Sequence, residues 1–121
     1  MLMELNRPLF AFEKDDSSMF LIERPDRLLY HLEAIDIEND EYLFWDSSGA
    51  AVSVSTVHGK IDRITPCDQS MSLADAFRMY SHSRGLEISA EGTPVEVWEC
   101  IQSRLPRKKG FWKRLFPRLQ K

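Results

Sequence analysis

Residues 41–65 constrain the fold of this chain more than any other segment. They contain three runs of strand-forming residues, separated by two short turns that each include a glycine. In the first run, aromatic and aliphatic side chains follow one another from Tyr42 to Trp45, which favours a strand. In the second, Val52 and Val54 alternate with serines, a pattern typical of a strand with one solvated face. Because turns this short join antiparallel neighbours, the segment predicts a three-stranded meander.

The aromatic run also raises the question of which side chains enter the core. Adjacent residues of a strand face opposite sides of a sheet. We therefore expect either Phe44 or Trp45 to be exposed, where it would be available to a partner.

A second pair of strands is expected near the N-terminus. Leu9–Phe12 and Met19–Ile22 are apolar runs on either side of the polar sequence Asp15-Asp16-Ser17-Ser18, an arrangement that predicts a β-hairpin. Both faces of the first run are apolar, so we expect these strands to be well buried.

Three helices are predicted, near residues 25–34, 73–84 and 94–105. The strongest local signal is Thr93-Pro94-Val95-Glu96, in which an N-cap threonine, a proline and a glutamate form a capping box. In the first helix, Leu28, Leu32 and Ile35 recur at helical spacing. In the same segment, Leu28, Tyr30, Leu32 and Ala34 also occupy every second position, as apolar residues of a strand would. A strand is therefore the competing interpretation there.

These elements predict an α+β fold. The hairpin and the meander would form a mainly antiparallel sheet, with about three helices packed on one face. A length of 121 residues fits a single core, so we expect one domain over residues 1–105 and a tail over residues 106–121. Hydrophobic residues make up 43% of the chain, too many for a disordered protein, and no apolar run approaches the roughly 18–20 residues of a membrane span.

The charge of the chain is divided unevenly along the sequence. The formal net charge is −3, yet residues 104–121 carry eight basic side chains and no acidic one. Residues 1–103 therefore have a net charge of −11, and the remainder has one of +8. Such an asymmetry bears on partners and association rather than on the fold.

The C-terminal tail combines basic residues with large apolar ones. On a helical projection its aromatic side chains share one arc, which suits an anionic membrane surface, the groove of a partner or single-stranded nucleic acid. The competing interpretation is a solvated tail, or one folded back on the acidic body. The candidate binding residues are Arg107, Lys108, Lys109, Phe111, Trp112, Lys113, Arg114 and Phe116.

A second candidate surface is acidic and lies between residues 33 and 46. Its candidate binding residues are Glu33, Asp36, Glu38, Asp40, Glu41 and Asp46, with no basic residue among them. Such a surface would receive a basic partner. Counted from Asp36, the sixth position is Glu41 where an EF-hand needs glycine, which excludes that calcium loop. The competing interpretation is a solvated connection between two elements.

No arrangement of residues predicts catalysis, a metal site or a cofactor. His31-Leu32-Glu33 and Pro66-Cys67 match part of the zinc deaminase pattern, but Ser70 stands where that pattern has its second cysteine. Two ligands remain where zinc needs three from the protein. The glycines form no phosphate-binding loop, and no nucleophile elbow is present. We therefore expect no enzymatic activity, no catalytic residue, no metal and no cofactor.

Two functions are compatible with these features. The first is a small, non-catalytic interaction module (an adaptor, an inhibitor or an immunity-like partner) that binds a protein. The alternative is a peripheral binder of anionic membranes or single-stranded nucleic acid through residues 107–119. Two cysteines are too few for a disulfide scaffold and the N-terminus lacks a long apolar segment, so we expect a cytoplasmic location.

Overall fold

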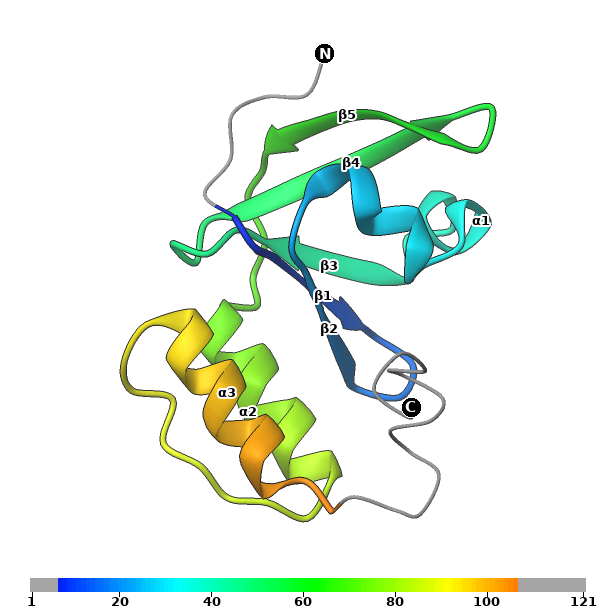
Figure 1. The fold of residues 1–121 in the computed structure, drawn as a ribbon. Coiled ribbons are helices and arrows are strands. Elements are labelled where there is room, and N and C mark those ends of the chain that lie inside the picture. Colours follow the sequence, from blue (N-terminus) through cyan, green and yellow to red (C-terminus); the bar gives the residue numbers. More distant parts are fainter. Residues whose placement is uncertain (1–6, 107–121) are drawn as a thin grey trace, which may run out of the picture.

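The computed structural model describes residues 7–106, and within them five strands form one antiparallel sheet (Figure 1). The strands are β1 (Leu9–Glu13), β2 (Ser18–Ile22), β3 (Tyr42–Trp45), β4 (Ala51–Val57) and β5 (Lys60–Pro66). The helices are η1 (Pro25–Tyr30, a 3-10 helix), α1 (Ala34–Glu38), α2 (Leu73–Ser83) and α3 (Pro94–Arg104). The predicted α+β fold is thereby confirmed.

The strand order is β2-β1-β3-β4-β5. The predicted hairpin is β1–β2 and the predicted meander is β3–β4–β5, so both are confirmed. β1 joins the two units, because it pairs with β3 on its other side and places Glu13 opposite Tyr42. At the β4–β5 turn, His58 and Gly59 both have positive φ, as a type I′ hairpin turn requires.

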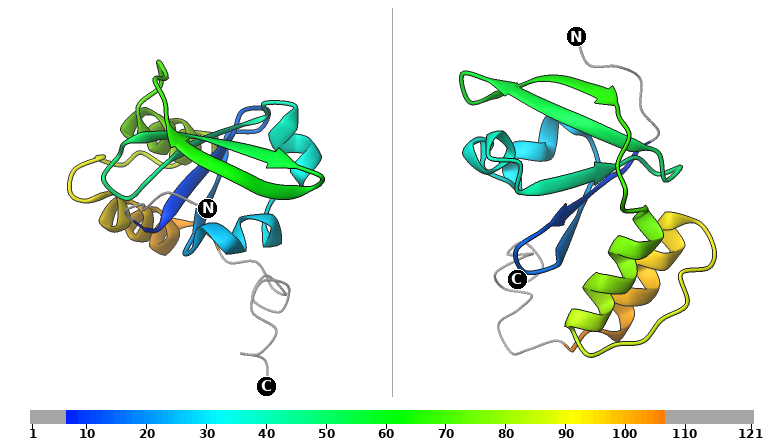
Figure 2. Two further views of the ribbon diagram at one scale, coloured as in Figure 1. Left: turned by 90° about the horizontal axis from the view of Figure 1, so that it is seen from above. Right: turned by 180° about the vertical axis from the view of Figure 1, so that it is seen from behind.

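The two faces of the sheet support two separate cores. Phe10 and Phe12 of β1 pack with α2 and α3, whereas Leu9 and Ala11 pack with η1 and α1. Figures 1 and 2 show α2 and α3 side by side on one side of the sheet, with η1 and α1 on the other. The expectation that the helices cover one face is therefore wrong. Both faces of β1 are apolar, and each needs its own cover.

Local sequence signals determine α2 and α3. Ser72 Oγ accepts a hydrogen bond from the backbone N–H of Asp75 and begins α2. At the start of α3, Thr93 and Glu96 form the predicted capping box, and Pro94 is the first helical residue. Both helices match their predicted positions, because their caps and their apolar faces specify the same ends.

The segment 25–34 differs from its prediction. In place of one helix of about three turns, η1 ends at Tyr30 and α1 begins at Ala34, with Glu33 between them in an extended conformation. No side-chain cap stabilises the start of either helix. Leu28 and Leu32 pack in the same core, whereas Ile35 of the predicted apolar stripe is 60% exposed.

In the meander, the expectation that Phe44 or Trp45 is exposed is wrong, and the expectation of a solvated face on β4 is confirmed. Phe44 and Trp45 are both buried, one in each core, so neither is available to a partner. Ser53 and Ser55 are exposed on β4, as the predicted solvated face requires. Within residues 7–106 every helix is too short or too polar to cross a bilayer.

Candidate functional site

The structure describes only one of the two candidate surfaces. The basic and aromatic residues of the C-terminal tail, from Arg107 to Phe116, lie outside the described residues. The acidic candidates are all described, and the structure brings only some of them together.

Five carboxylates form the cluster that we call the acidic cluster. They come from two segments of the chain that backbone hydrogen bonds hold side by side, and the charges of Asp15, Asp16 and Asp36 contribute to the raised pKa of Glu13 or Glu41. The members are Glu13, Asp15, Asp16, Asp36 and Glu41. Asp36 and Glu41 were expected from the sequence, whereas the three residues of the β1–β2 hairpin were missed.

The pairing of β1 with β3 brings these segments together. The backbone N–H of Lys14, just after β1, donates to the carbonyl of Glu41 at 3.0 Å, just before β3. The N–H of Glu41 in turn donates to the carbonyl of Asp36 at 3.1 Å, so the chain turns back after α1. The end of β1 and the end of α1 are thus held side by side, with their acidic side chains together.

This arrangement raises the pKa of two carboxyls. For Glu13 the largest cause is desolvation by burial, followed by the charge of Asp16 and a hydrogen bond with it. For Glu41 it is again desolvation, followed by the charges of Asp36 and Asp15. Each of these groups would be more stable with a proton or with a cation close by.

Two neighbouring groups respond differently to the same surroundings. Desolvation and the charge of Glu13 raise the pKa of Tyr42 to about 12, so its phenol stays neutral. Burial by itself would raise the pKa of Asp16, but hydrogen bonds from Ser18 outweigh it and lower the pKa. Asp16 is therefore a firmly ionised member of the acidic cluster.

Two basic side chains, Lys14 and Arg84, lie at the margin of the acidic cluster, and the charge of Arg84 helps to lower the pKa of Asp16. Lys14 Nζ forms an ion pair with Asp40 Oδ2 at 3.1 Å, and the side chain of Asp40 is 85% exposed. An ion pair this exposed contributes little to stability. Lys14 is thus directed to Asp40, and the acidic cluster keeps most of its negative charge.

The remaining predicted acidic residues lie elsewhere. Glu33 and Glu38 are exposed at the two ends of α1 and, within the described residues, form no ion pair or hydrogen bond with the acidic cluster. Asp46 is only 6% exposed, so its assignment to an acidic face is wrong. Its Oδ1 accepts hydrogen bonds from the N–H and hydroxyl of Ser48 and the N–H of Ala50, at 2.6–3.1 Å. Asp46 organises the β3–β4 turn.

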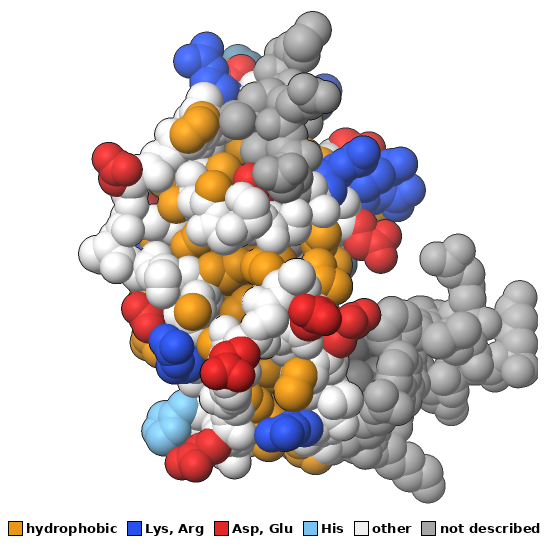
Figure 3. Space-filling model, turned by 90° about the vertical axis from the view of Figure 1, so that its left-hand side faces the viewer, with side chains coloured by type: hydrophobic (Ala, Val, Ile, Leu, Met, Phe, Trp, Pro, Cys, Tyr) orange, Lys and Arg blue, Asp and Glu red, His pale blue; other side chains and the backbone are white. Residues whose placement is uncertain are grey.

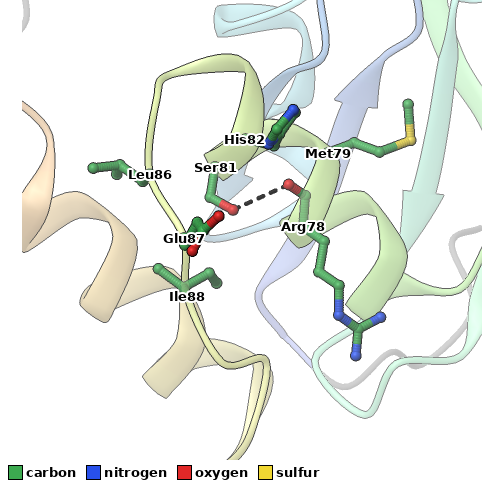
Figure 4. A pocket seen from close by; sticks show the side chains of 7 residues that line it. All are labelled: Arg78, Met79, Ser81, His82, Leu86, Glu87 and Ile88. Atoms are coloured by element: carbon green, nitrogen blue, oxygen red, sulfur yellow. Dashed lines mark hydrogen bonds between the residues drawn. The ribbon is translucent and has the colours of Figure 1, made fainter.

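A shallow pocket of about 500 Å³ lies at the end of α2, against residues 86–88. Figure 4 shows Arg78 and His82 pointing in different directions, and Arg78 is already paired with Asp75 at 2.8 Å. Ser81 donates its hydroxyl hydrogen bond to the carbonyl of Arg78. No pair of titratable groups converges in this pocket, so it offers no catalytic arrangement.

The face of the molecule drawn in Figure 3 is partly hydrophobic, in contrast to the acidic cluster. Hydrophobic side chains gather in a band between the sheet above and the helices below, and charged side chains are scattered around it. The negative charge on this face is dispersed, unlike that of the acidic cluster.

The potential metal ligands of residues 7–106 are dispersed over the structure. No three His, Cys, Asp or Glu side chains in this part of the chain are placed to hold a metal ion. His58 and His82 are exposed in a turn and at a helix end. Burial and the charge of Asp68 raise the pKa of the Cys67 thiol, which disfavours the reactive thiolate.

One feature of the sequence indicates where the hairpin carboxylates Asp15 and Asp16 lie. Asp15 and Asp16 occupy a turn between two strands, which places them at a sheet end. Their proximity to Asp36 depends on the β1–β3 pairing, which joins residues far apart in sequence and has no local signature.

Comparison with family models, curated proteins and solved structures finds no match to this chain.

Proposed function

We propose that this chain is a small, non-catalytic interaction module that binds a basic protein partner through the acidic cluster. The observation that carries the proposal is the convergence of five carboxylates from two segments, two of them with raised pKa. A surface that holds like charges together at the expense of their ionisation favours a cation. An adaptor, an inhibitor or an immunity-like protein would use such a surface.

A partner rich in lysine and arginine supplies the matching chemistry. Its cations would lie beside Glu13 and Glu41 and offset the desolvation and the repulsion that raise their pKa. Long-range attraction between opposite charges also steers encounter, so association would be fast and sensitive to salt.

The test is a titration of the full chain with a synthetic lysine-rich peptide, followed by amide NMR shifts at low salt. We expect the shifts to be largest at residues 13–16 and 36–41. The variant Glu13→Gln/Glu41→Gln should weaken binding about three- to tenfold, because each lost charge pair contributes a modest free energy.

A matched control is Glu87→Gln/Glu91→Gln, which removes two charges outside the acidic cluster. It should leave the affinity nearly unchanged. Equal weakening by both variants, or shifts spread evenly over the acidic residues, would show that only net charge matters and would reject the surface.

A second candidate function is binding to an anionic membrane or to single-stranded nucleic acid through residues 107–119. Its support is the sequence, in which Phe111 and Trp112 stand among lysines and arginines. Anionic vesicles and single-stranded RNA are therefore added as separate ligands. Binding that Trp112→Ala abolishes and Glu13→Gln/Glu41→Gln preserves would assign function to the tail instead.

We also propose a cytoplasmic location for the protein. Its support is the cysteine content, since Cys67 and Cys100 are too few for a disulfide scaffold. A fluorescent fusion of the full chain, followed by cell fractionation, tests it.

A further inference from the structure

The two outer strands of the sheet differ in how well they are protected against pairing with a further strand. An outer strand presents unpaired backbone groups, and many proteins protect them with charges, bulges or proline. β5 carries three charged residues, Lys60, Asp62 and Arg63, and a register shift disturbs its ladder with β4 near Ser55. The β5 edge is therefore protected.

β2 has none of these features. Its sequence, Ser-Met-Phe-Leu-Ile, contains no charge and no proline, and its ladder with β1 is regular from Ser18 to Ile22. Phe20 and Leu21 are only partly buried. Among the described residues, the backbone of Met19–Ile22 has no hydrogen-bond partner outside β1. This edge can accept another strand.

The chain beyond Pro106 begins close to one end of this edge. Gln102 Nε2 donates to the hydroxyl oxygen of Tyr80 at 3.2 Å, so the last turns of α3 and α2 lie side by side. Arg84, just after α2, donates from Nη2 to Ser18 Oγ at 2.7 Å, at the start of β2. Figures 1 and 2 show both helices ending on the same side of the molecule. A segment that joins the edge from there by a short connection runs parallel to β2.

We propose that residues 111–116 of the same chain pair with β2 as a further, parallel strand. Gly110 and Pro117 bound this segment in the sequence, which leaves six residues to lie beside the five of β2. Four residues, 107–110, connect it to Pro106, a usual length for a helix-to-strand connection. Fully extended, the chain from Pro106 to Phe111 spans up to about 17 Å, which is long enough to reach β2 from the end of α3.

The sequence of this segment suits an outer strand. It is Phe-Trp-Lys-Arg-Leu-Phe, and aromatic residues favour strands. Because successive side chains alternate between the faces of a sheet, each face would receive two apolar residues and one basic residue. The apolar residues would extend the two cores at Phe20 and Leu21, which are packed against them but only partly buried. Lys113 and Arg114 would then protect the new edge, as the charges of β5 protect the other.

Charge and tethering favour this segment over a strand from another molecule. Arg107, Lys108 and Lys109 lie in the connection, which starts on the side of the β1–β2 hairpin. Asp15 and Asp16 occupy the turn of that hairpin, so opposite charges meet there. A connection this short also gives an effective concentration of the order of millimolar, above that of a second copy in a micromolar solution.

NMR and amide hydrogen exchange on the full chain test the proposal. We expect NOEs between residues 111–116 and Met19–Ile22, and slow exchange at the β2 N–H groups that point away from β1. Adjacent N–H groups of a strand point to opposite edges, so Lys113→Pro/Arg114→Pro removes the one that faces β2. Exchange at those β2 groups should become about tenfold faster or more.

A matched control is Lys113→Gln/Arg114→Gln, which loses the same two charges but keeps both N–H groups. It should retain the NOEs and the slow exchange. A sample that mixes isotope-labelled and unlabelled chains shows whether the NOEs arise within one copy. If they do, Phe111 and Trp112 belong to the fold and are not free to bind a membrane or a nucleic acid.

Four results would overturn the proposal. They are fast exchange of the outward β2 groups in the full chain, helical Cα shifts at residues 111–116, NOEs only between different copies, and equal loss of protection in the proline and glutamine variants. The proposal does not rest on the acidic cluster, whose binding of a lysine-rich peptide is measured at residues 13–16 and 36–41. The two proposals therefore fail separately.

Discussion

Asp46 and Glu13 are both acidic residues in contact with the sheet, and their surroundings give them opposite roles. Asp46 lies almost wholly inside the protein, where two backbone N–H groups and a hydroxyl satisfy its carboxylate. Glu13 is partly desolvated and has carboxylates for neighbours, and both disfavour its negative charge. Hydrogen-bond donors stabilise a buried carboxylate, whereas like charges destabilise a partly buried one.

The structure predicts that Asp46→Ala destabilises the protein by about 1–3 kcal/mol, because the N–H groups of Ser48 and Ala50 lose their acceptor. Urea unfolding followed by fluorescence measures the change. Asp46→Asn is the control, since its amide oxygen can still accept these bonds and should cost less. Equal losses in the two variants would mean that the charge, and not the hydrogen bonds, stabilises the turn.

Glu13→Gln is predicted to increase the free energy of unfolding at pH 7. The folded state raises the pKa of Glu13 above its ordinary value of 4.5, so it binds the proton more tightly than the unfolded chain does. The unfavourable contribution of Glu13 is therefore absent below about pH 4 and grows as the pH rises through the folded pKa.

Chemical unfolding of both proteins at pH 3.5 and pH 7 tests this sign. The stabilisation by glutamine should be present at pH 7 and nearly absent at pH 3.5, where the glutamate itself is neutral. A variant less stable than the wild type at pH 7 would contradict the assigned environment of Glu13.

Among the elements, those with a capping signal were predictable and the one without it was not. Ser72 and Thr93 mark the starts of α2 and α3, and both helices occur where the sequence predicts them. Residues 25–34 have helical apolar spacing but no side-chain cap, and Ile35, the third residue of that spacing, is 60% exposed. Local propensity is a weak term that packing overrides.

The candidate site was only partly predictable for a related reason. The β1–β2 and β3–β4–β5 units are local, and short turns specify them. The contact between the units is not local, so nothing near Asp36 in the sequence indicates that Glu13 lies beside it. Asp46 stands before Ser47-Ser48-Gly49, a context typical of an Asx turn, and this signal was available.

Thr93→Ala is predicted to destabilise the protein by about 1 kcal/mol. Thr93 Oγ1 accepts from the N–H of Glu96 at 3.2 Å, and the N–H of Thr93 donates to Glu96 Oε1 at 2.8 Å. Thermal unfolding measures the loss. Thr93→Ser keeps the hydroxyl and should retain most of the stability, and if serine and alanine behave alike, the capping bond contributes little.

In the whole molecule, β1 is the central structural element. Its two apolar faces hold the α2–α3 core and the η1–α1 core on opposite sides of the sheet, and its two edges join the hairpin to the meander. Its C-terminal end then carries Glu13 into the acidic cluster. The strand that organises the fold is thus also the one that concentrates negative charge at one end of the sheet.

The response of the whole molecule to salt follows from a competition between attraction and repulsion. Within residues 7–106 there are three ion pairs, all between largely exposed side chains, and salt weakens such pairs only slightly in energy. The acidic cluster opposes them with five carboxylates at short range. Screening removes more repulsion than attraction, so the free energy of unfolding at pH 7 should rise as sodium chloride increases from about 0.05 to about 0.5 M.

The same experiment on Glu13→Gln/Glu41→Gln locates the source of this effect. If the acidic cluster causes the repulsion, the variant should be more stable at low salt and its stability should depend much less on salt. Glu87→Gln/Glu91→Gln removes an equal charge elsewhere and should keep the slope of the wild type. A wild-type protein that salt destabilises at pH 7 would mean that the three ion pairs outweigh the acidic cluster, and the electrostatic basis for a basic partner would be lost.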